Sequence, residues 1–285
     1  MKLARRLLKA LAWLSAAMAA TPVLALALLT TEPGTRWALQ QAAKFGDLAG
    51  ISVQFDDVSG NLLYDITISG LRVRFGDSLF EAAALHLRWR PAALRHRLLH
   101  IEALALTSPR YVGGPGEDAA AGPPSIPELG LPLAVRLDRL ALTDLTVAQG
   151  DGRFALARAG LAARLGAERW SVTGLELEAE GYGLAGDLAL QPTAPHALAG
   201  TLTGWFQAPD QPRLRARLSV AGAALAPRLA VEVTEPAALR ADATLALAEP
   251  EPRFDAVATW PRLAWPISGE ATYWAEQGRL AVAGT

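Results

Sequence analysis

Hydrophobic and polar residues alternate at every second position over several stretches of the chain. The clearest stretches lie at 64–68, 71–75 and 83–90. A period of two residues is typical of a half-buried β-strand, because successive side chains of a strand point to opposite faces. The pattern predicts three short strands that share one apolar face, with turns at Ser69–Gly70 and Gly76–Asp77 between them.

The same alternation returns in the second half of the chain, and turn residues separate nearly all of its occurrences. The further predicted strands are Leu137–Val147, Trp170–Leu177, Leu184–Leu190, Leu214–Val220, Leu229–Val233, Leu239–Leu247, Phe254–Trp260 and Leu280–Val282. No helical period lies between them, and parallel strands need long crossovers. We therefore expect a mainly β protein whose strands follow one another in an antiparallel meander.

The N-terminal segment has a different pattern. Residues 10–31 carry no formal charge, and a helix of that length spans about 33 Å, which is enough to cross a bilayer. Lys2, Arg5, Arg6 and Lys9 precede it, so the positive-inside rule places the N-terminus in the cytoplasm and the remainder of the chain outside. The residues predicted to form the apolar surface of this anchor are Leu11, Trp13, Leu14, Val23, Leu24, Leu26, Leu28 and Leu29. A cleaved signal peptide with a site at Ala25–Leu26–Ala27 is the alternative.

Five regions follow from these patterns. A helix is predicted over Thr35–Lys44, with Thr35 as its capping residue and Trp37 at the depth of the lipid headgroups, although an ordinary linker helix fits as well. The expected regions are a cytoplasmic tip and membrane anchor at 1–31, the interfacial helix and linker at 32–50, a first sheet segment at 51–112, a flexible Gly/Pro loop at 113–130, and a second sheet segment at 131–285 that looks truncated.

Composition excludes several classes of function. The net charge is −1, which argues against a nucleic-acid-binding protein because phosphates are neutralised by a surplus of Lys and Arg. There is no Cys, so disulfides, Cys-ligated zinc and thiol nucleophiles are excluded. No GxSxG, HExxH or Walker motif is present.

The remaining catalytic signals fail on their context. Gly181–Gly186 matches GxGxxG, but a strand follows it and not a helix, so we interpret these glycines as part of a hairpin turn. His96 and His100 lack a third metal ligand nearby, and we interpret them as solvated loop residues. Asp56 and Asp57 are interpreted as a solvated turn, because neighbours on a strand point apart. We therefore expect neither an enzyme nor a cofactor or metal site.

Arginines form the sharpest local charge feature. They share the polar face of the first predicted strands or lie just after them, and comprise Arg72, Arg74, Arg88, Arg90, Arg95 and Arg97. A solvated outer face explains them, and contact with anionic lipid headgroups is the functional alternative.

Several strings of residues resemble a known family. Val58–Leu63, Leu85–Leu94 and Leu99–Leu106 resemble the N-terminal region of the TamB family, in the wider AsmA-like group. Trp260–Ile267, followed by Gly278–Gly284, is similar to a repeat unit farther along such chains. The resemblance covers essentially the whole chain, but TamB chains are far longer, and the C-terminal domain that engages the outer-membrane barrel has no counterpart here.

This resemblance implies a fold and a role. Members are anchored in the bacterial inner membrane and build a long, curved β-groove (a β-taco) with an apolar interior in the periplasm. The implied role is outer-membrane biogenesis, either as a conduit that carries phospholipid between the two membranes or as an assembly and tethering partner of an outer-membrane barrel of the TamA type.

The residues themselves support a groove. An open sheet has to cover its apolar face with another sheet or with something else apolar, and acyl chains would serve. The expected lining comprises Ile66, Ile68, Leu71, Val73, Leu85, Leu87 and Trp89. Twelve to fourteen strands at about 4.8 Å each give a groove of roughly 60–65 Å. A strand-pairing assembly factor and a secreted β-sandwich with a cleaved signal are the alternatives.

Overall fold

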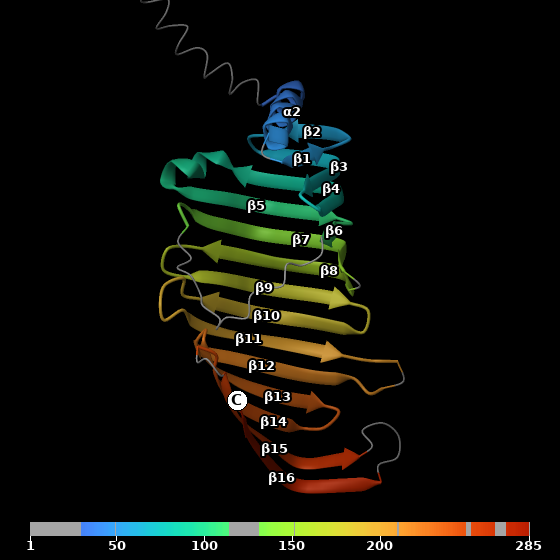
Figure 1. The fold of residues 1–285 in the computed structure, drawn as a ribbon, viewed down its shortest axis with the longest axis vertical. Coiled ribbons are helices and arrows are strands. Elements are labelled where there is room, and N and C mark those ends of the chain that lie inside the picture. The colour runs from blue at the N-terminus through green and yellow to red at the C-terminus, as the bar shows by residue number, and fades with distance from the viewer. Residues whose placement is uncertain are drawn as a thin grey trace, which may run out of the picture.

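The computed structural model describes one α-helix, one short 3-10 helix and one large sheet (Figure 1). It describes residues 30–48, 50–113, 131–150, 152–209, 211–248, 252–265 and 272–284. The eight predicted anchor residues, and most of the predicted 113–130 loop, lie outside these ranges. Within them, no helix combines the length and the apolar character that a membrane crossing requires.

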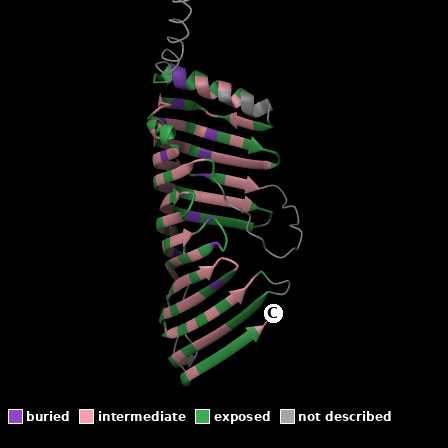
Figure 2. Cartoon of the chain, turned by 90° about the vertical axis from the view of Figure 1, so that its left-hand side faces the viewer, coloured by how far each residue is buried: buried purple, intermediate pink, exposed green. Residues whose placement is uncertain are grey.

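Sixteen strands form the sheet in the described part of the chain. Their bounds are β1 Ile51–Gln54, β2 Asp57–Asn61, β3 Asp65–Phe75, β4 Ser78–Arg90, β5 Leu98–Thr107, β6 Arg110–Gly113, β7 Ala134–Gln149, β8 Gly152–Leu165, β9 Trp170–Ala179, β10 Tyr182–Leu190, β11 Ala197–Phe206, β12 Leu214–Ala223, β13 Ala226–Glu235, β14 Leu239–Ala246, β15 Arg253–Trp265 and β16 Tyr273–Gly284. From β7 to β16 each strand pairs with the next one in the sequence. Figure 2 shows that the sheet is long and curved, and the described residues form no second sheet that could pack on it.

The predicted turn at Ser69–Gly70 is wrong, because β3 continues through it. Gly70 has a left-handed backbone, with φ of 62°. Such a residue inside a strand reverses the alternation of side chains without ending the strand. The apolar positions change from even numbers (Ile66 and Ile68) to odd numbers (Leu71 and Val73) at this point, so both pairs face the same way.

The change of phase at Gly70 extends across neighbouring strands as one row. Ser69 pairs with Ala84, Ala84 with Thr107, and Thr107 with Thr143. The residues that directly follow Ser69, Thr107 and Thr143 are Gly70, Ser108 and Asp144, and their φ values are 62°, 47° and 58°. Left-handed positions therefore lie along one row of the sheet at β3, at the junction of β5 and β6, and at β7, although β4 between them has none.

One pairing departs from the predicted antiparallel meander. β5 and β6 lie end to end in the sheet, and both pair with β7 in parallel. Parallel neighbours require a connection that returns the chain to the starting end of the strand. The Gly/Pro-rich residues between Gly113 and Ala134, which we interpreted only as a loop, provide the chain length for that return.

Helix α2 (Glu32–Leu48) packs beside β1 and β2 at one end of the sheet. It begins earlier and ends later than predicted. Thr31 accepts a hydrogen bond from the Gly34 amide at 3.3 Å and caps the helix, with Pro33 in the first turn. Thr35, the predicted cap, lies inside the helix and is fully buried, and its Oγ1 accepts a hydrogen bond from the Leu62 amide at 3.0 Å.

Candidate functional site on the apolar face of the sheet

Cross-strand pairing places apolar residues in unbroken rows across the sheet. One row contains no charged or polar side chain from β4 to β16. Its members, each paired with the next, are Trp89, Ile101, Leu137, Ala163, Val172, Leu188, Gly200, Val220, Leu229, Ala243, Ala256 and Val282. The strands therefore share one continuous apolar face.

A second row runs beside the first, from β3 to β14. Its members are Ile68, Leu85, Leu106, Leu142, Ala159, Leu177, Leu184, Gly204, Ala216, Val233 and Leu239. Side chains in neighbouring strands of such a row lie within contact distance. The two rows together make an apolar strip that follows the long axis of the molecule.

This strip is only partly buried. Among the described residues, the buried hydrophobic ones are Val58, Ile66, Leu71, Ala82, Leu156 and Ala179. A sheet that packed against a second layer would bury most of one face. The side chains of the apolar face instead remain partly exposed to solvent along the sheet. An apolar ligand could therefore contact them.

The seven predicted lining residues fall at the α2 end of the face. All lie on β3 or β4, and the register pairs Ile66 with Leu87 and Ile68 with Leu85. Ile66 is 1% exposed and Leu71 is 8% exposed, so these two belong to the packing of the sheet. The sequence analysis missed most of the strip, which continues through β7–β16 with the same alternation of residues.

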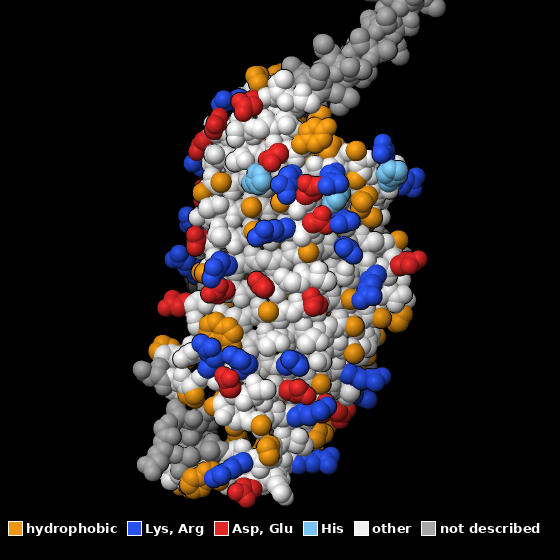
Figure 3. Space-filling view, turned by 180° about the vertical axis from the view of Figure 1, so that it is seen from behind, with side chains coloured by type: hydrophobic (Ala, Val, Ile, Leu, Met, Phe, Trp, Pro, Cys, Tyr) orange, Lys and Arg blue, Asp and Glu red, His pale blue; other side chains and the backbone are white. Residues whose placement is uncertain are grey.

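The opposite face carries the charged residues, as Figure 3 shows. Arg72 lies 3.7 Å from both Asp56 and Glu81. Glu102 lies 3.0 Å from Arg88 and also contacts Arg90. Three of the six arginines singled out in the sequence, Arg72, Arg88 and Arg90, are thus in ion pairs on a solvated outer face, and Asp56 is part of one of these pairs.

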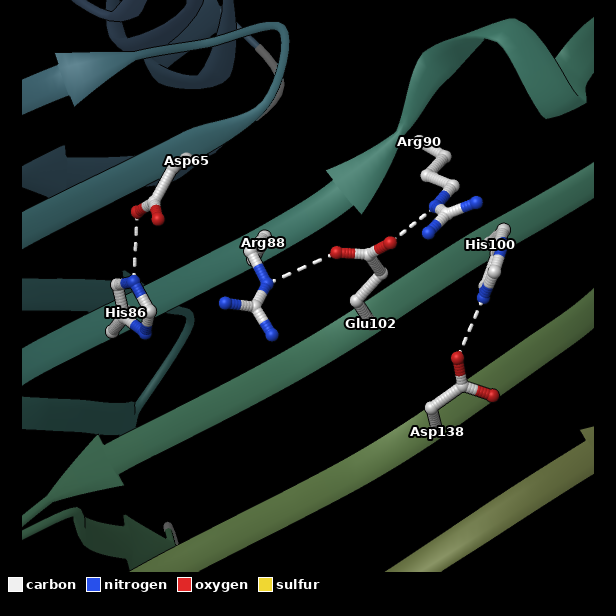
Figure 4. A network of polar contacts seen from close by, with 7 residues as sticks. All are labelled: Asp65, His86, Arg88, Arg90, His100, Glu102 and Asp138. Carbon is white, nitrogen blue, oxygen red and sulfur yellow. Dashed lines mark hydrogen bonds and ion pairs between the residues drawn. The ribbon is translucent and has the colours of Figure 1, made fainter.

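His100 contradicts its predicted place in a solvated loop. It lies on β5, is 8% exposed, and its Nε2 donates a hydrogen bond of 2.7 Å to Asp138 on β7 (Figure 4). Arg136 also lies 2.7 Å from Asp138. The second histidine of the network, His86 on β4, contacts Asp65 on β3 at 2.7 Å, and His96 is exposed as expected.

Two carboxyl groups of this network have shifted pKa values. The hydrogen bond from His100, followed by that from Arg136, lowers the pKa of Asp138. The hydrogen bond from Arg90 lowers the pKa of Glu102. Both lowered pKa values mean that the folded protein favours the charged carboxylate. The contacts that cause the shifts join β5 to β7 and β4 to β5. The network has the composition of a structural ion-pair cluster, and no three potential ligands within the described ranges group as a metal site.

A hollow with a volume of about 1070 Å³ spans β7 to β12. Its lining includes Leu140, Leu142, Leu161, Leu177 and Leu184 from the apolar face, together with charged residues such as Asp138, Arg158 and Glu178. Small-molecule sites in proteins typically measure about 300–1,000 Å³. The hollow is therefore large enough for a bulky ligand.

The glycine motif that resembles a nucleotide site is part of a hairpin. Gly181 lies in the turn between β9 and β10 and has φ of 80°. Gly183 and Gly186 lie on β10, opposite Trp205 and Leu202 of β11. No helix follows, so the hairpin interpretation is confirmed.

Comparison with known proteins identifies the family. The family model described as "TamB, N-terminal domain" matches residues 116–285, which include β7 to β16. The match does not include the strings at 58–106, which remain a resemblance. Searches of curated proteins and of solved structures each found no match. The matched region is more than half of the chain and includes the part of the apolar face on β7 to β16, and the chain belongs to the TamB family.

Proposed function

We propose that this protein is anchored in the bacterial inner membrane, extends into the periplasm, and serves outer-membrane biogenesis by carrying phospholipid along its apolar face. The acyl chains would lie on the apolar strip while the headgroups remain in water. The protein would act without a cofactor and without catalysis. Membership of the TamB family and the N-terminal apolar stretch support this location.

The unbroken row from Trp89 to Val282 is the observation that carries the proposal. A single charge facing an acyl chain in such a row would be costly, because an ion has to be desolvated there. With strands about 4.8 Å apart, the sheet from β1 to β16 is about 62 Å long. This agrees with the predicted length and gives a path for many acyl chains in succession.

Photo-crosslinking in the full chain tests the proposal. A photoreactive phenylalanine analogue is placed at Leu177 or Leu202, whose side chains lie on the apolar face. Matched variants carry it at Glu176 or Thr203, the adjacent positions on the opposite face. After illumination in membranes, we expect phospholipid adducts at the two leucine positions and at least tenfold fewer at the two polar positions.

Equal lipid labelling on the two faces would contradict the proposal, because it would indicate surrounding membrane and not a ligand on the strip. Polypeptide adducts without lipid at Leu177 and Leu202 would also contradict it, and would favour the alternative below. Circular dichroism of each variant verifies that the sheet is intact.

The alternative function is assembly of outer-membrane proteins together with a barrel of the TamA type. The outer edge of β16 favours it, since no other described strand pairs with this edge and nearly all its residues are exposed. An exposed edge can accept an added strand through main-chain hydrogen bonds. Crosslinks from Ala281 to unfolded barrel strands, absent with the same label at Ala230 on β13, would support this function.

A further inference from the structure

The connection between β4 and β5 is larger than the pairing of these strands requires. Antiparallel neighbours can be joined by two residues, as at Gly76–Asp77 between β3 and β4. Here the 3-10 helix η1 (Pro91–His96) and Arg97 protrude from the sheet instead. No residue of η1 is buried, so the packing of the sheet does not explain this segment.

The protruding segment combines cations with one exposed leucine. Arg95, His96 and Arg97 follow Leu94, which is 43% exposed, and no acidic residue occurs from 91 to 101. We call Leu94–Arg97 the η1 tip.

Ion pairs separate the six arginines noted in the sequence into two groups. Arg72, Arg88 and Arg90 are neutralised by carboxylates of the sheet. For Arg74, Arg95 and Arg97, the described part of the chain contains no carboxylate within ion-pair distance, and of these Arg95 and Arg97 belong to the η1 tip. The Arg95 side chain contacts His96 at 3.1 Å. The positive charge of the η1 tip is therefore available to an external anion.

The position of the tip defines the class of partner. Figure 1 shows η1 beyond the ends of β4 and β5, towards the end of the sheet where α2 lies. Trp37 of α2 is 55% exposed at the same end. An exposed leucine followed by cations, with an exposed indole nearby, is the composition of a surface that inserts at the boundary of acyl chains and anionic headgroups.

We propose that the η1 tip docks on the surface of an anionic bilayer, with Leu94 inserted among the lipids and Arg95 and Arg97 on their headgroups. This would hold the α2 end of the apolar strip against the membrane from which lipid is taken. The proposal rests on the membrane attachment proposed above. Each arginine near an anionic surface contributes about a fivefold gain in binding.

The chain has no cysteine, so one introduced cysteine can be labelled uniquely. Leu94→Cys in the full chain is labelled with an environment-sensitive fluorophore and reconstituted in nanodiscs, either of phosphatidylcholine alone or with 30% phosphatidylglycerol. Thr203→Cys on β11 is the control, since Thr203 is exposed on the polar face, opposite the apolar strip. We expect lipid-borne quenchers to quench the label at position 94 at least threefold more in anionic discs, and the label at position 203 equally in both discs.

Two pairs of substitutions test whether the quenching at position 94 depends on the positive charge of the η1 tip. Arg95→Gln with Arg97→Gln should abolish the extra quenching at position 94, whereas Arg228→Gln with Arg279→Gln, which removes the same charge from β13 and β16, should leave it unchanged. Equal quenching at positions 94 and 203, equal quenching in both kinds of disc, or quenching that survives the Arg95/Arg97 substitutions would each overturn the proposal. Co-elution of the chain with the discs reports membrane attachment separately, and lipid photo-crosslinking at Leu177 reports the proposed conduit.

Discussion

His100 and Asp138 lie 38 residues apart in the sequence and form a contact between the parallel strands β5 and β7. The folded protein lowers the pKa of Asp138, chiefly through the hydrogen bond from His100. A carboxyl group whose pKa is lower when folded stabilises the fold above its unfolded pKa, and this contribution is lost as the pH falls through the folded value. For Asp138 the loss begins below about pH 4.

Asp138→Asn is therefore expected to flatten the acid side of the stability profile. Urea unfolding of the full chain in detergent, followed by circular dichroism, should give a midpoint that falls more between pH 5 and pH 2.5 in the native protein than in Asp138→Asn. Glu168→Gln, in the exposed turn between β8 and β9, is the control and should behave as the native protein does. Equal slopes in the native protein and Asp138→Asn would contradict this.

Gly70 allows a second test at this scale. A Cβ at Gly70 would lie 1.9 Å from Oδ2 of Asp56, whereas a Cβ at Gly76 would meet no atom within 4 Å, and both glycines have a positive φ. Alanine at either position strains the backbone, but at Gly70 it also displaces Asp56 from Arg72. Gly70→Ala should lower the free energy of unfolding by up to about 1 kcal/mol more than Gly76→Ala, because the ion pair that it displaces is exposed. Similar losses in the two variants would argue against the steric cause.

At the scale of elements, α2 is fastened to the sheet by specific contacts. The Leu62 amide donates to Oγ1 of Thr35, while the Leu62 carbonyl accepts from the Trp89 indole at 2.8 Å. Arg36 and Asp57 lie 3.5 Å apart at the surface, where an ion pair contributes little. The hydrogen bond of the buried Thr35 hydroxyl is thus expected to contribute most to the attachment of α2 to the sheet.

Thr35→Val keeps the shape of the side chain but leaves the Leu62 amide without this acceptor. We expect it to lower the free energy of unfolding by about 1–3 kcal/mol, and Thr35→Ser to cost less because the hydroxyl remains. Hydrogen exchange should show faster exchange of the amides of β2 in Thr35→Val. Unchanged exchange in β2 would indicate that the helix is held by other contacts.

Strands with a clear alternation were predictable from the sequence, and those rich in small residues were not. The strands from β9 onward correspond to the predicted ones, except β11, which was missed. β8, also missed, contains Ala155, Ala157, Ala159, Ala162 and Ala163, and alanine favours helices and is depleted in strands. The neighbours of β8 in the sheet impose its conformation, and the sequence of the segment alone does not contain that information.

Non-local features of the site were not predictable. The parallel pairing of β5 with β7 depends on partners far apart in the sequence, as does the burial of His100. The apolar face was predicted correctly at β3 and β4 but was recognised only there, because its continuity depends on the register of each successive pair. The left-handed residues Ser108 and Asp144 are not glycines, so they gave no signal.

At the scale of the whole molecule, the outer edge of β16, with which no other described strand pairs, is expected to govern association in solution. β16 is long, and Leu280 and Val282 are 54% and 45% exposed. Long exposed apolar edges pair with one another unless charge interrupts them. Sedimentation of the full chain in mild detergent should show association that increases with concentration, and Ala281→Lys with Ala283→Lys should abolish it. Lysines at Ala221 and Ala230, which lie on the inner strands β12 and β13, should leave this association unchanged.

The strand order also determines how the molecule resists a pulling force. Antiparallel neighbours joined by a hairpin open one hydrogen bond at a time when their free ends are pulled, so β16 back to β8 would unzip in sequence. β5 and β7 differ, because they run in parallel and the chain enters β5 at one end of the pair and leaves β7 at the other. Tension along the chain would load their hydrogen bonds in shear, all at once. This pair, at the border of the family match, would be the last part of the sheet to yield in a single-molecule stretching experiment.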